Sequence, residues 1–180
     1  MSVVPPRAPC LRAINLAPIA AALCGLLIAC GPPAPLASAS QLKTPYPLES
    51  IDAIDLSGQR VSTGAWKNQV VIINVWATWC APCRRELPVL EKLQAAYRDR
   101  VRVLAVLQDN VSDEFAKKFV AQAGLSFSVV RSSDEIERRL PAILLIPMTF
   151  VIDREGRMVS MFAGEADANE LEREVKRLLN

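Results

Sequence analysis

Residues 70–83 of this chain are VVIINVWATWCAPC, an apolar run that ends in two cysteines separated by two residues. The first part, Val70–Trp76, is apolar apart from Asn74, which is typical of a buried strand. Apolar residues then recur at helical spacing between residues 87 and 97. The sequence therefore predicts a strand, a short turn and a helix, with the cysteine pair where the helix begins.

The spacing of Cys80 and Cys83 predicts redox chemistry. Positions i and i+3 lie on one face of a helix, so the two sulfurs can form a disulfide. The N-terminus of a helix carries partial positive charge, which favours a thiolate over a thiol at Cys80. Because the thiolate is the reactive form, we expect Cys80 to be the nucleophile and Cys83 to be the second catalytic thiol.

Metal and haem sites are the main alternatives for these thiols. Structural zinc needs four Cys or His ligands as a rule, and the chain contains no His. Haem attachment of the c type requires His directly after the second cysteine, where Arg84 stands. A copper(I) site made by the two thiolates remains open, because copper(I) accepts soft ligands. The favoured interpretation uses no metal and no organic cofactor, only a redox-active disulfide.

The N-terminal residues have the pattern of an export signal. Residues 1–12 contain Arg7 and Arg12 and no acidic residue, and a mostly apolar stretch extends from there to Ala29. Residues 27–31, LIACG, resemble a bacterial lipoprotein signal, which implies cleavage before Cys30 and lipidation of Cys30. An ordinary signal peptide or an uncleaved anchor is the alternative. Each version places the remaining chain outside the cytoplasm, and the lipoprotein version anchors it to a membrane.

Composition divides the chain into three parts. We expect a signal peptide over residues 1–29, a Pro-, Ala- and Ser-rich tether over residues 30–47 and one folded domain over residues 48–180. Beyond residue 30, acidic and basic residues number 19 each. A domain without net charge lacks the basic face that nucleic-acid binding requires, so we expect no nucleic-acid partner.

Strands and helices alternate along the predicted domain. Ser57-Gly58 separates two short strands, which predicts an N-terminal hairpin. The pattern predicts an α/β fold, a mixed sheet with helices on both faces. The further predicted elements are strands at 101–107, 127–130, 148–153 and 157–162, and helices at 112–123, 133–140 and from 167 to the end.

Several motifs together resemble one family. They are DLSG at 55–58, the strand and cysteine motif at 70–83, RRE at 84–86 and IPMTFVID at 146–153. With these motifs the chain resembles the TlpA-like, exported thiol–disulfide oxidoreductases of the thioredoxin superfamily. The resemblance implies a thioredoxin-like fold and protein disulfide exchange by Cys80 and Cys83. In the related peroxiredoxins a Thr stands three residues before the reactive cysteine; Ala77 occupies that place here, which disfavours a peroxidase.

The resemblance also implies a substrate-binding surface. Pro147 corresponds to a cis proline that faces the disulfide, although sequence alone favours a trans bond. A cis bond there would expose the backbone of Ile146 to a substrate peptide, which could pair with it as an added strand. Trp79 and Pro82, within the cysteine motif, are assigned to the same surface.

Two departures from the thioredoxin pattern concern this region. Thioredoxins carry a buried Asp six residues before the first cysteine, where this chain has Asn74. TlpA-like members instead often place Glu three residues after the second cysteine, as Glu86 is here, which suggests a redox-tuning role for Glu86. The alternative is a solvated Glu86 paired with Arg84, Arg85 or a downstream Lys. The second departure is residues 140–146, LPAILLI, where many relatives have Tyr and Gly.

The resemblance implies partners as well. The Ala-Pro pair between the cysteines is similar to that of reducing members, so we expect a disulfide reductase that receives electrons from a membrane donor. Its protein substrates would be apocytochrome c thiols or copper-site cysteines. The second interpretation is a membrane-tethered copper(I) carrier that uses the same two thiols, for which Met148 is the one further soft ligand expected nearby.

Overall fold

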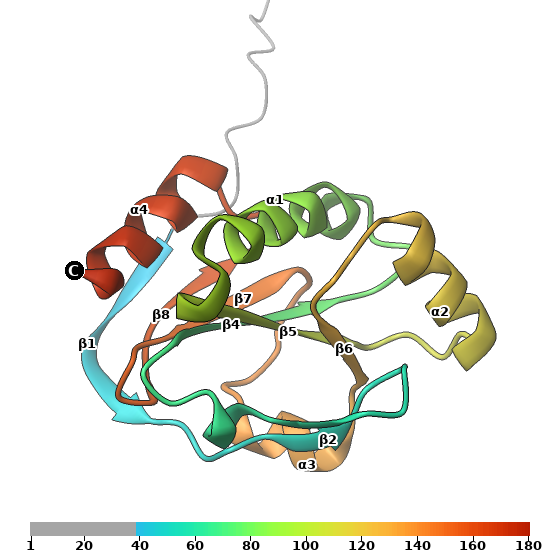
Figure 1. Ribbon diagram of the computed structural model, residues 1–180, viewed down its shortest axis with the longest axis horizontal. Coiled ribbons are helices and arrows are strands. Elements are labelled where there is room, and N and C mark those ends of the chain that lie inside the picture. Colours follow the sequence, from blue (N-terminus) through green and yellow to red (C-terminus); the bar gives the residue numbers. More distant parts are fainter. Residues whose placement is uncertain (1–38) are drawn as a thin grey trace, which may run out of the picture. The chain divides into compact units, whose positions relative to one another are not determined.

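Strand β4 (Val70–Trp76) lies in the middle of a six-stranded sheet in the computed structural model, which describes residues 39–180 (Figure 1). Strands β5 and β6 are parallel to β4, whereas β7 is antiparallel to it. The strand order is β1-β8-β7-β4-β5-β6. The other strands are β1 (Ala39–Pro47), β5 (Val101–Leu107), β6 (Ser128–Arg131), β7 (Met148–Ile152) and β8 (Arg157–Ala163).

Helices cover both faces of this sheet. Helices α1 (Ala81–Tyr97), α2 (Asp113–Gln122) and α4 (Ala168–Leu179) pack on one face, and α3 (Asp134–Arg139) packs on the other (Figure 1). The hairpin of β2 (Asp52–Ile54) and β3 (Arg60–Ser62) also contributes to the second face. The predicted fold class is confirmed. Short 3-10 helices occupy Thr63–Ala65 and Arg98–Arg100.

Side chains of β4 alternate between the two cores. Ile72 and Trp76 point into the core under α1, α2 and α4, while Ile73 and Val75 point into the core beside α3. Because both faces are covered, all seven residues of β4 are buried, which explains the continuous apolar run. Asn74 is on the same side of the strand as Ile72, so its polar side chain is held beneath helix α1.

The predicted boundary of the folded domain is wrong. Residues 39–47 were expected to belong to the tether, but they form the edge strand β1, which pairs antiparallel with β8. Tyr46 donates a hydrogen bond from its hydroxyl to the sulfur of Met158 at 3.2 Å. Proline is tolerated in an edge strand because its missing N–H can face away from the neighbouring strand. The predicted signal peptide and Cys30 lie outside the described residues.

Helix caps fix the starts of the later helices. Ser112, Ser133 and Asp167 each accept a hydrogen bond from a backbone N–H in the first turn of α2, α3 and α4. These helices therefore begin where the sequence predicted. Within residues 39–180, no helix combines the length and the apolar character that crossing a membrane requires.

Candidate active site at the end of the central strand

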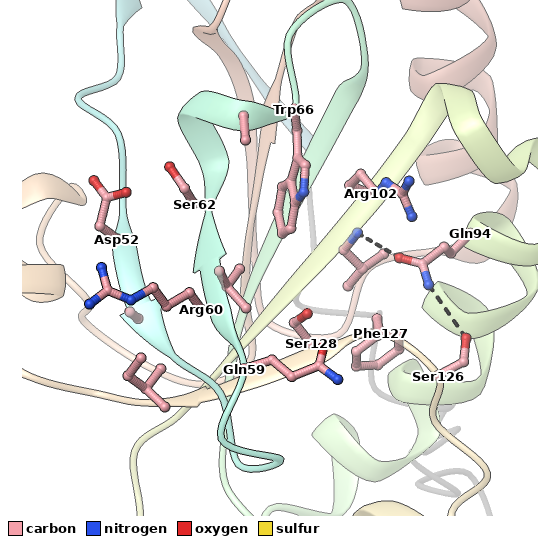
Figure 2. A pocket seen from close by; sticks show the side chains of 15 residues that line it. Asp52, Gln59, Arg60, Ser62, Trp66, Gln94, Arg102, Ser126, Phe127 and Ser128 are labelled. Carbon is pink, nitrogen blue, oxygen red and sulfur yellow. Dashed lines mark hydrogen bonds between the residues drawn. The ribbon is translucent and has the colours of Figure 1, made fainter.

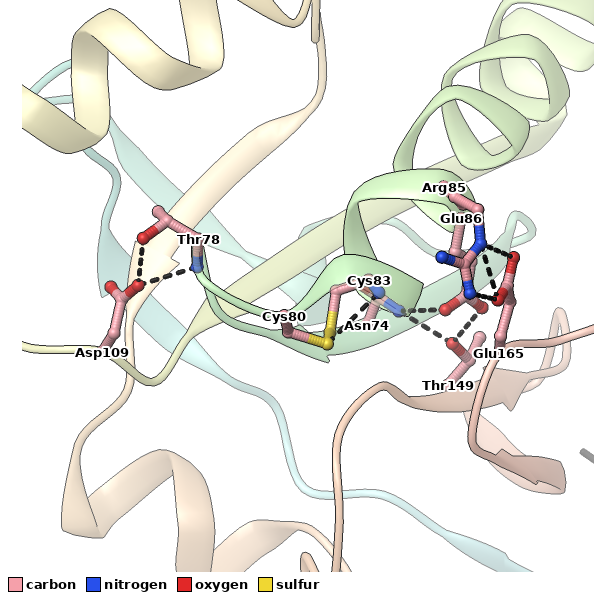
Figure 3. The surroundings of a disulfide bond; sticks show 9 residues. All are labelled: Asn74, Thr78, Cys80, Cys83, Arg85, Glu86, Asp109, Thr149 and Glu165. Carbon is pink, nitrogen blue, oxygen red and sulfur yellow. Dashed lines mark hydrogen bonds and ion pairs between the residues drawn. A yellow bond between two sulfur atoms is a disulfide. The ribbon is translucent and has the colours of Figure 1, made fainter. Parts of the chain in front are cut away.

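The two cysteines of the motif form a disulfide where β4 gives way to α1. Cys80 is the N-cap residue of α1, and its Cα lies 5.3 Å from that of Cys83. Both residues are buried, with 4% of Cys80 and 0% of Cys83 exposed. The structure thus places the predicted pair at the helix start (Figure 3). Cys80 is the slightly more exposed member of the pair.

The first turn of α1 is electrostatically suited to a thiolate at Cys80. The backbone N–H of Cys83 donates a hydrogen bond to the sulfur of Cys80 over 3.2 Å. No acidic residue lies in that turn to oppose negative charge. Pro82, which is half-buried, occupies an early helical position where its missing N–H leaves no hydrogen bond unmade. After reduction, this geometry favours the anion on Cys80 over the thiol.

A carboxylate anchors the turn that precedes Cys80. One oxygen of Asp109, just beyond the end of β5, accepts hydrogen bonds from the backbone N–H of Thr78 at 2.7 Å and from its hydroxyl at 2.6 Å (Figure 3). Sequence reasoning missed Asp109. The available signal was a polar residue closely following a buried strand that is parallel to β4, since the carboxyl ends of parallel strands meet at one edge.

Glu86 is buried one helical turn beyond Cys83. Only 1% of the residue is exposed. Desolvation raises the pKa of Glu86 to about 7, although hydrogen bonds from Thr149, the backbone of Ala166 and Asn74 act to lower it. The negative charge of Glu165 also raises it. A carboxyl group that titrates near neutral pH can both accept and release protons there.

The alternative of a solvated, arginine-paired Glu86 is wrong. Arg85 instead forms an ion pair with Glu165, with a guanidinium nitrogen 2.6 Å from a carboxylate oxygen (Figure 3). Arg84 is exposed on the outer side of the helix. Glu86 faces the sheet because it is one turn from Cys83 and adjacent to the buried Leu87, on the apolar side of α1.

The partners of Glu86 come from two neighbouring strands. Asn74 on β4 and Thr149 on β7 are directly opposite each other in the antiparallel register. The Thr149 hydroxyl donates to one oxygen of Glu86 at 2.8 Å, and the side-chain amide of Asn74 donates to the other at 3.3 Å. Sequence reasoning missed Thr149, which is polar within the otherwise apolar strand that follows Pro147.

Apolar residues lie at the same end of the sheet as the disulfide. Trp79 is 71% exposed, and Leu144 and Leu145 are 85% and 46% exposed. The bond between Ile146 and Pro147 is cis, as the resemblance implied. Ile146 is half-buried and Pro147 is buried. Met148 at the start of β7 pairs with Val75 near the end of β4. Residues 144–147, which precede β7, therefore lie at the same edge of the sheet as Trp79 and Cys80, which follow β4.

The described residues form a cavity but no metal-binding cluster. No group of three or more His, Cys, Asp or Glu side chains is arranged there to hold a metal ion. A pocket of about 800 Å³ lies between the β2–β3 hairpin and the beginnings of β5 and β6, with Trp66, Arg60 and Arg102 in its wall (Figure 2). The beginnings of these two strands are at the opposite end of the sheet from the disulfide, because β5 and β6 are parallel to β4, so this pocket is separate from the disulfide.

Comparison with known proteins places this geometry in a wider group. The Redoxin family model matches residues 33–179. The thiol-disulfide oxidoreductase ResA of Bacillus anthracis is 30% identical over 124 residues, which are 69% of this chain and 72% of that protein. A secreted thiol-disulfide isomerase from Corynebacterium glutamicum is 27% identical with a TM-score of 0.70, covering 83% of this chain and 95% of that one. A thiol:disulfide interchange protein of the thioredoxin family from Chlorobium tepidum is 26% identical with a TM-score of 0.70, covering 76% and 98%.

Proposed function

This chain belongs to the Redoxin family and is a thiol–disulfide oxidoreductase of the thioredoxin superfamily, and from that premise we propose that it reduces protein disulfides outside the cytoplasm while anchored to a membrane. The observation that carries the proposal is the Cys80–Cys83 disulfide at the N-terminus of α1, with the buried Glu86 one turn further on. No organic cofactor takes part.

In the proposed reaction two electrons pass from the protein dithiol to the substrate. The Cys80 thiolate attacks one sulfur of a substrate disulfide, and the other substrate sulfur leaves as a thiolate. Cys83 loses its proton to Glu86 and attacks the sulfur of Cys80 in the mixed disulfide. The second substrate sulfur then leaves, and the Cys80–Cys83 disulfide is restored. A membrane donor supplies the electrons for the next cycle, because the compartment itself is oxidising.

Substrates are proposed from the resemblance and from the surface around the disulfide. The TlpA-like pattern suggests apocytochrome c or copper-site proteins with oxidised cysteines. Exposed Trp79, Leu144 and Leu145 support a protein segment with large apolar side chains near its disulfide, since apolar contact is favourable when both surfaces leave water. By the same resemblance, the backbone of Ile146, which precedes Pro147, would pair with an extended substrate as an added strand.

The direction of electron flow is tested by the reduction potential of the Cys80–Cys83 pair. Equilibration with glutathione or dithiothreitol buffers should give a value near the roughly −270 mV of thioredoxin, and the reduced protein should reduce insulin. A potential near about −120 mV would identify an oxidant and overturn the reductase assignment. Stoichiometric copper(I) in the purified reduced protein, without insulin reduction, would favour the copper carrier.

Leu144 and Leu145 should contribute to the recognition of protein substrates. Replacing Leu144 and Leu145 together by Ser should lower kcat/KM for a disulfide-bonded protein about tenfold, because about 50 Å² of lost apolar burial corresponds to about 1.3 kcal/mol. Reduction of a small aromatic disulfide should remain unchanged. Ile54→Ser is the matched control, since Ile54 is also exposed, at 57%, but lies on β2 in the wall of the separate pocket. Equal losses for protein and small substrates would contradict this role.

The membrane anchor depends on Cys30, which lies outside the described residues. Mass spectrometry of the membrane fraction should find a mature N-terminus at Cys30 that carries acyl chains, because residues 27–31 match the lipoprotein pattern. Cys30→Ala should release the chain from that fraction or leave its leader uncleaved. A mature form that begins downstream of Cys30 would refute lipid anchoring.

A further inference from the structure

The hydrogen bonds around Glu86 fit only one of its two protonation states. As a carboxylate it accepts from the Thr149 hydroxyl at 2.8 Å, from the Asn74 side-chain amide at 3.3 Å and from the backbone of Ala166. The Asn74 amide donates its other hydrogen to Thr149 at 2.8 Å (Figure 3). Every group that forms a hydrogen bond with the carboxyl group therefore donates to it, as a negative charge requires.

One acceptor in this cluster is unused. The side-chain oxygen of Asn74 is buried and has no hydrogen-bond partner. Leaving a buried polar atom unpaired is costly, and such atoms in native proteins call for an explanation. A rotation of the side-chain amide would bring this oxygen to the place of the nitrogen, where the second protonation state of Glu86 needs an acceptor.

Protonation of Glu86 changes what its neighbours must do. The neutral carboxyl group carries an O–H that has to donate, and Thr149 is the neighbour placed to accept. The single hydroxyl hydrogen of Thr149 must then turn elsewhere. If the Asn74 amide rotates by half a turn, its oxygen replaces its nitrogen beside Thr149 and accepts that hydrogen. The direction of the hydrogen bonds is then reversed: Glu86 donates to Thr149, and Thr149 donates to Asn74.

We propose that Thr149 and Asn74 are positioning residues that hold Glu86 in both protonation states by reversing a shared chain of hydrogen bonds. This deepens the proposed function and rests on it, because it concerns the proton that Glu86 takes from Cys83 during resolution. Asn suits the position because its amide offers either a donor or an acceptor and stays neutral. An Asp there would place a second negative charge against Glu86.

Other groups near Glu86 also bear on its titration. Glu165, in the segment between β8 and α4, faces it and is paired with Arg85 on α1. Cys80 and Cys83 are the remaining titratable neighbours on α1, and in the disulfide form they do not titrate. Measurements on the oxidised full chain therefore isolate Glu86 and its hydrogen-bond partners from the thiol chemistry.

The first test uses NMR of the oxidised protein to follow Glu86 and Asn74, the two residues at the ends of the series of hydrogen bonds. The carboxyl carbon of Glu86 and the side-chain amide of Asn74 should titrate with one shared midpoint, near pH 7. Asn74 amide resonances that stay constant while Glu86 titrates would overturn the proposal. The result does not depend on exchange activity, so a chain that failed to reduce protein disulfides could still pass this test.

The second test removes the Thr149 hydroxyl. Thr149→Val should move the Glu86 midpoint upward by about one unit, because the hydrogen bond that the hydroxyl donates to the charged carboxylate is stronger than the one it accepts from the neutral acid. Thr149→Ser keeps the hydroxyl and should restore the midpoint to within a few tenths of a unit. In a Glu86→Gln background, Thr149→Val should leave the pH profile of exchange unchanged. An unmoved Glu86 midpoint in Thr149→Val would overturn the proposal, and if that variant does not fold, the Asn74 titration in the unsubstituted chain decides.

Discussion

Cys80→Ser should abolish protein disulfide reduction, with a loss of at least about 10³-fold, whereas Cys83→Ser should trap the mixed disulfide. The asymmetry follows from position. Cys80 caps α1 and receives the N–H of Cys83, so the favoured thiolate is on Cys80. Cys83 is 0% exposed and can attack only a sulfur already joined to Cys80.

Trapping distinguishes the two roles more sharply than activity does. Cys83→Ser incubated with an oxidised protein substrate should give a covalent adduct on non-reducing gels, and peptide mapping should place the bond at Cys80. Cys80→Ser should give no adduct under the same conditions. Limited alkylation of the reduced, unsubstituted protein should likewise label Cys80 first. An adduct through Cys83 in the Cys80→Ser variant would reverse the assignment.

Glu86→Gln should stabilise the oxidised protein at pH 8 by up to about 3 kcal/mol and change its stability little at pH 4. The pKa of Glu86 is about 7 in the folded chain against an ordinary value of 4.5. Between these values the folded chain holds a proton that the unfolded chain has released, so stability falls as pH rises from about 4.5 to about 7. The amide of Gln does not ionise, and the pH dependence disappears with it.

Urea unfolding of the oxidised protein at several pH values measures this effect. Glu49→Gln is the matched control, because Glu49 is exposed in the loop between β1 and β2. In the reduced protein, Glu86→Gln should also lower the pKa of the Cys80 thiol, since a negative neighbour is removed, and slow the resolving step, since a proton acceptor is lost. Parallel stability curves for Glu86→Gln and the unsubstituted chain would contradict the buried, proton-binding role.

Local sequence patterns determined the elements that carry the disulfide. The apolar run of β4 is continuous because both faces of that strand are covered, and its bounds agree with the prediction. Ser112 and Asp167 begin helices because each accepts a hydrogen bond from the backbone N–H three residues further on. The Cys80–Cys83 pairing is similarly local, since residues three apart meet within one turn.

Composition misled at the beginning of the domain. Pro45 and Pro47 made residues 30–47 look like an extended tether, because proline interrupts ordinary secondary structure. Residues 39–47 nevertheless form β1, whose partner β8 lies more than a hundred residues further along the chain. Pairing of an edge strand with a partner so far away in the sequence produces no periodic hydrophobic pattern within residues 39–47 themselves.

The proton chemistry of the site was decided by the tertiary structure. Sequence placed Glu86 one turn from Cys83 but left its solvent exposure open, and exposure depends on what the sheet presents beneath α1. Asn74 and Thr149 reach Glu86 from strands that are distant in sequence, 12 and 63 residues away. Asp109 secures the turn before Cys80 from 31 residues beyond Thr78. The sequence alone determined which thiols exchange electrons. Only long-range packing decided which neutral and charged groups surround these thiols, because burial and hydrogen bonding are properties of the assembled sheet and helix.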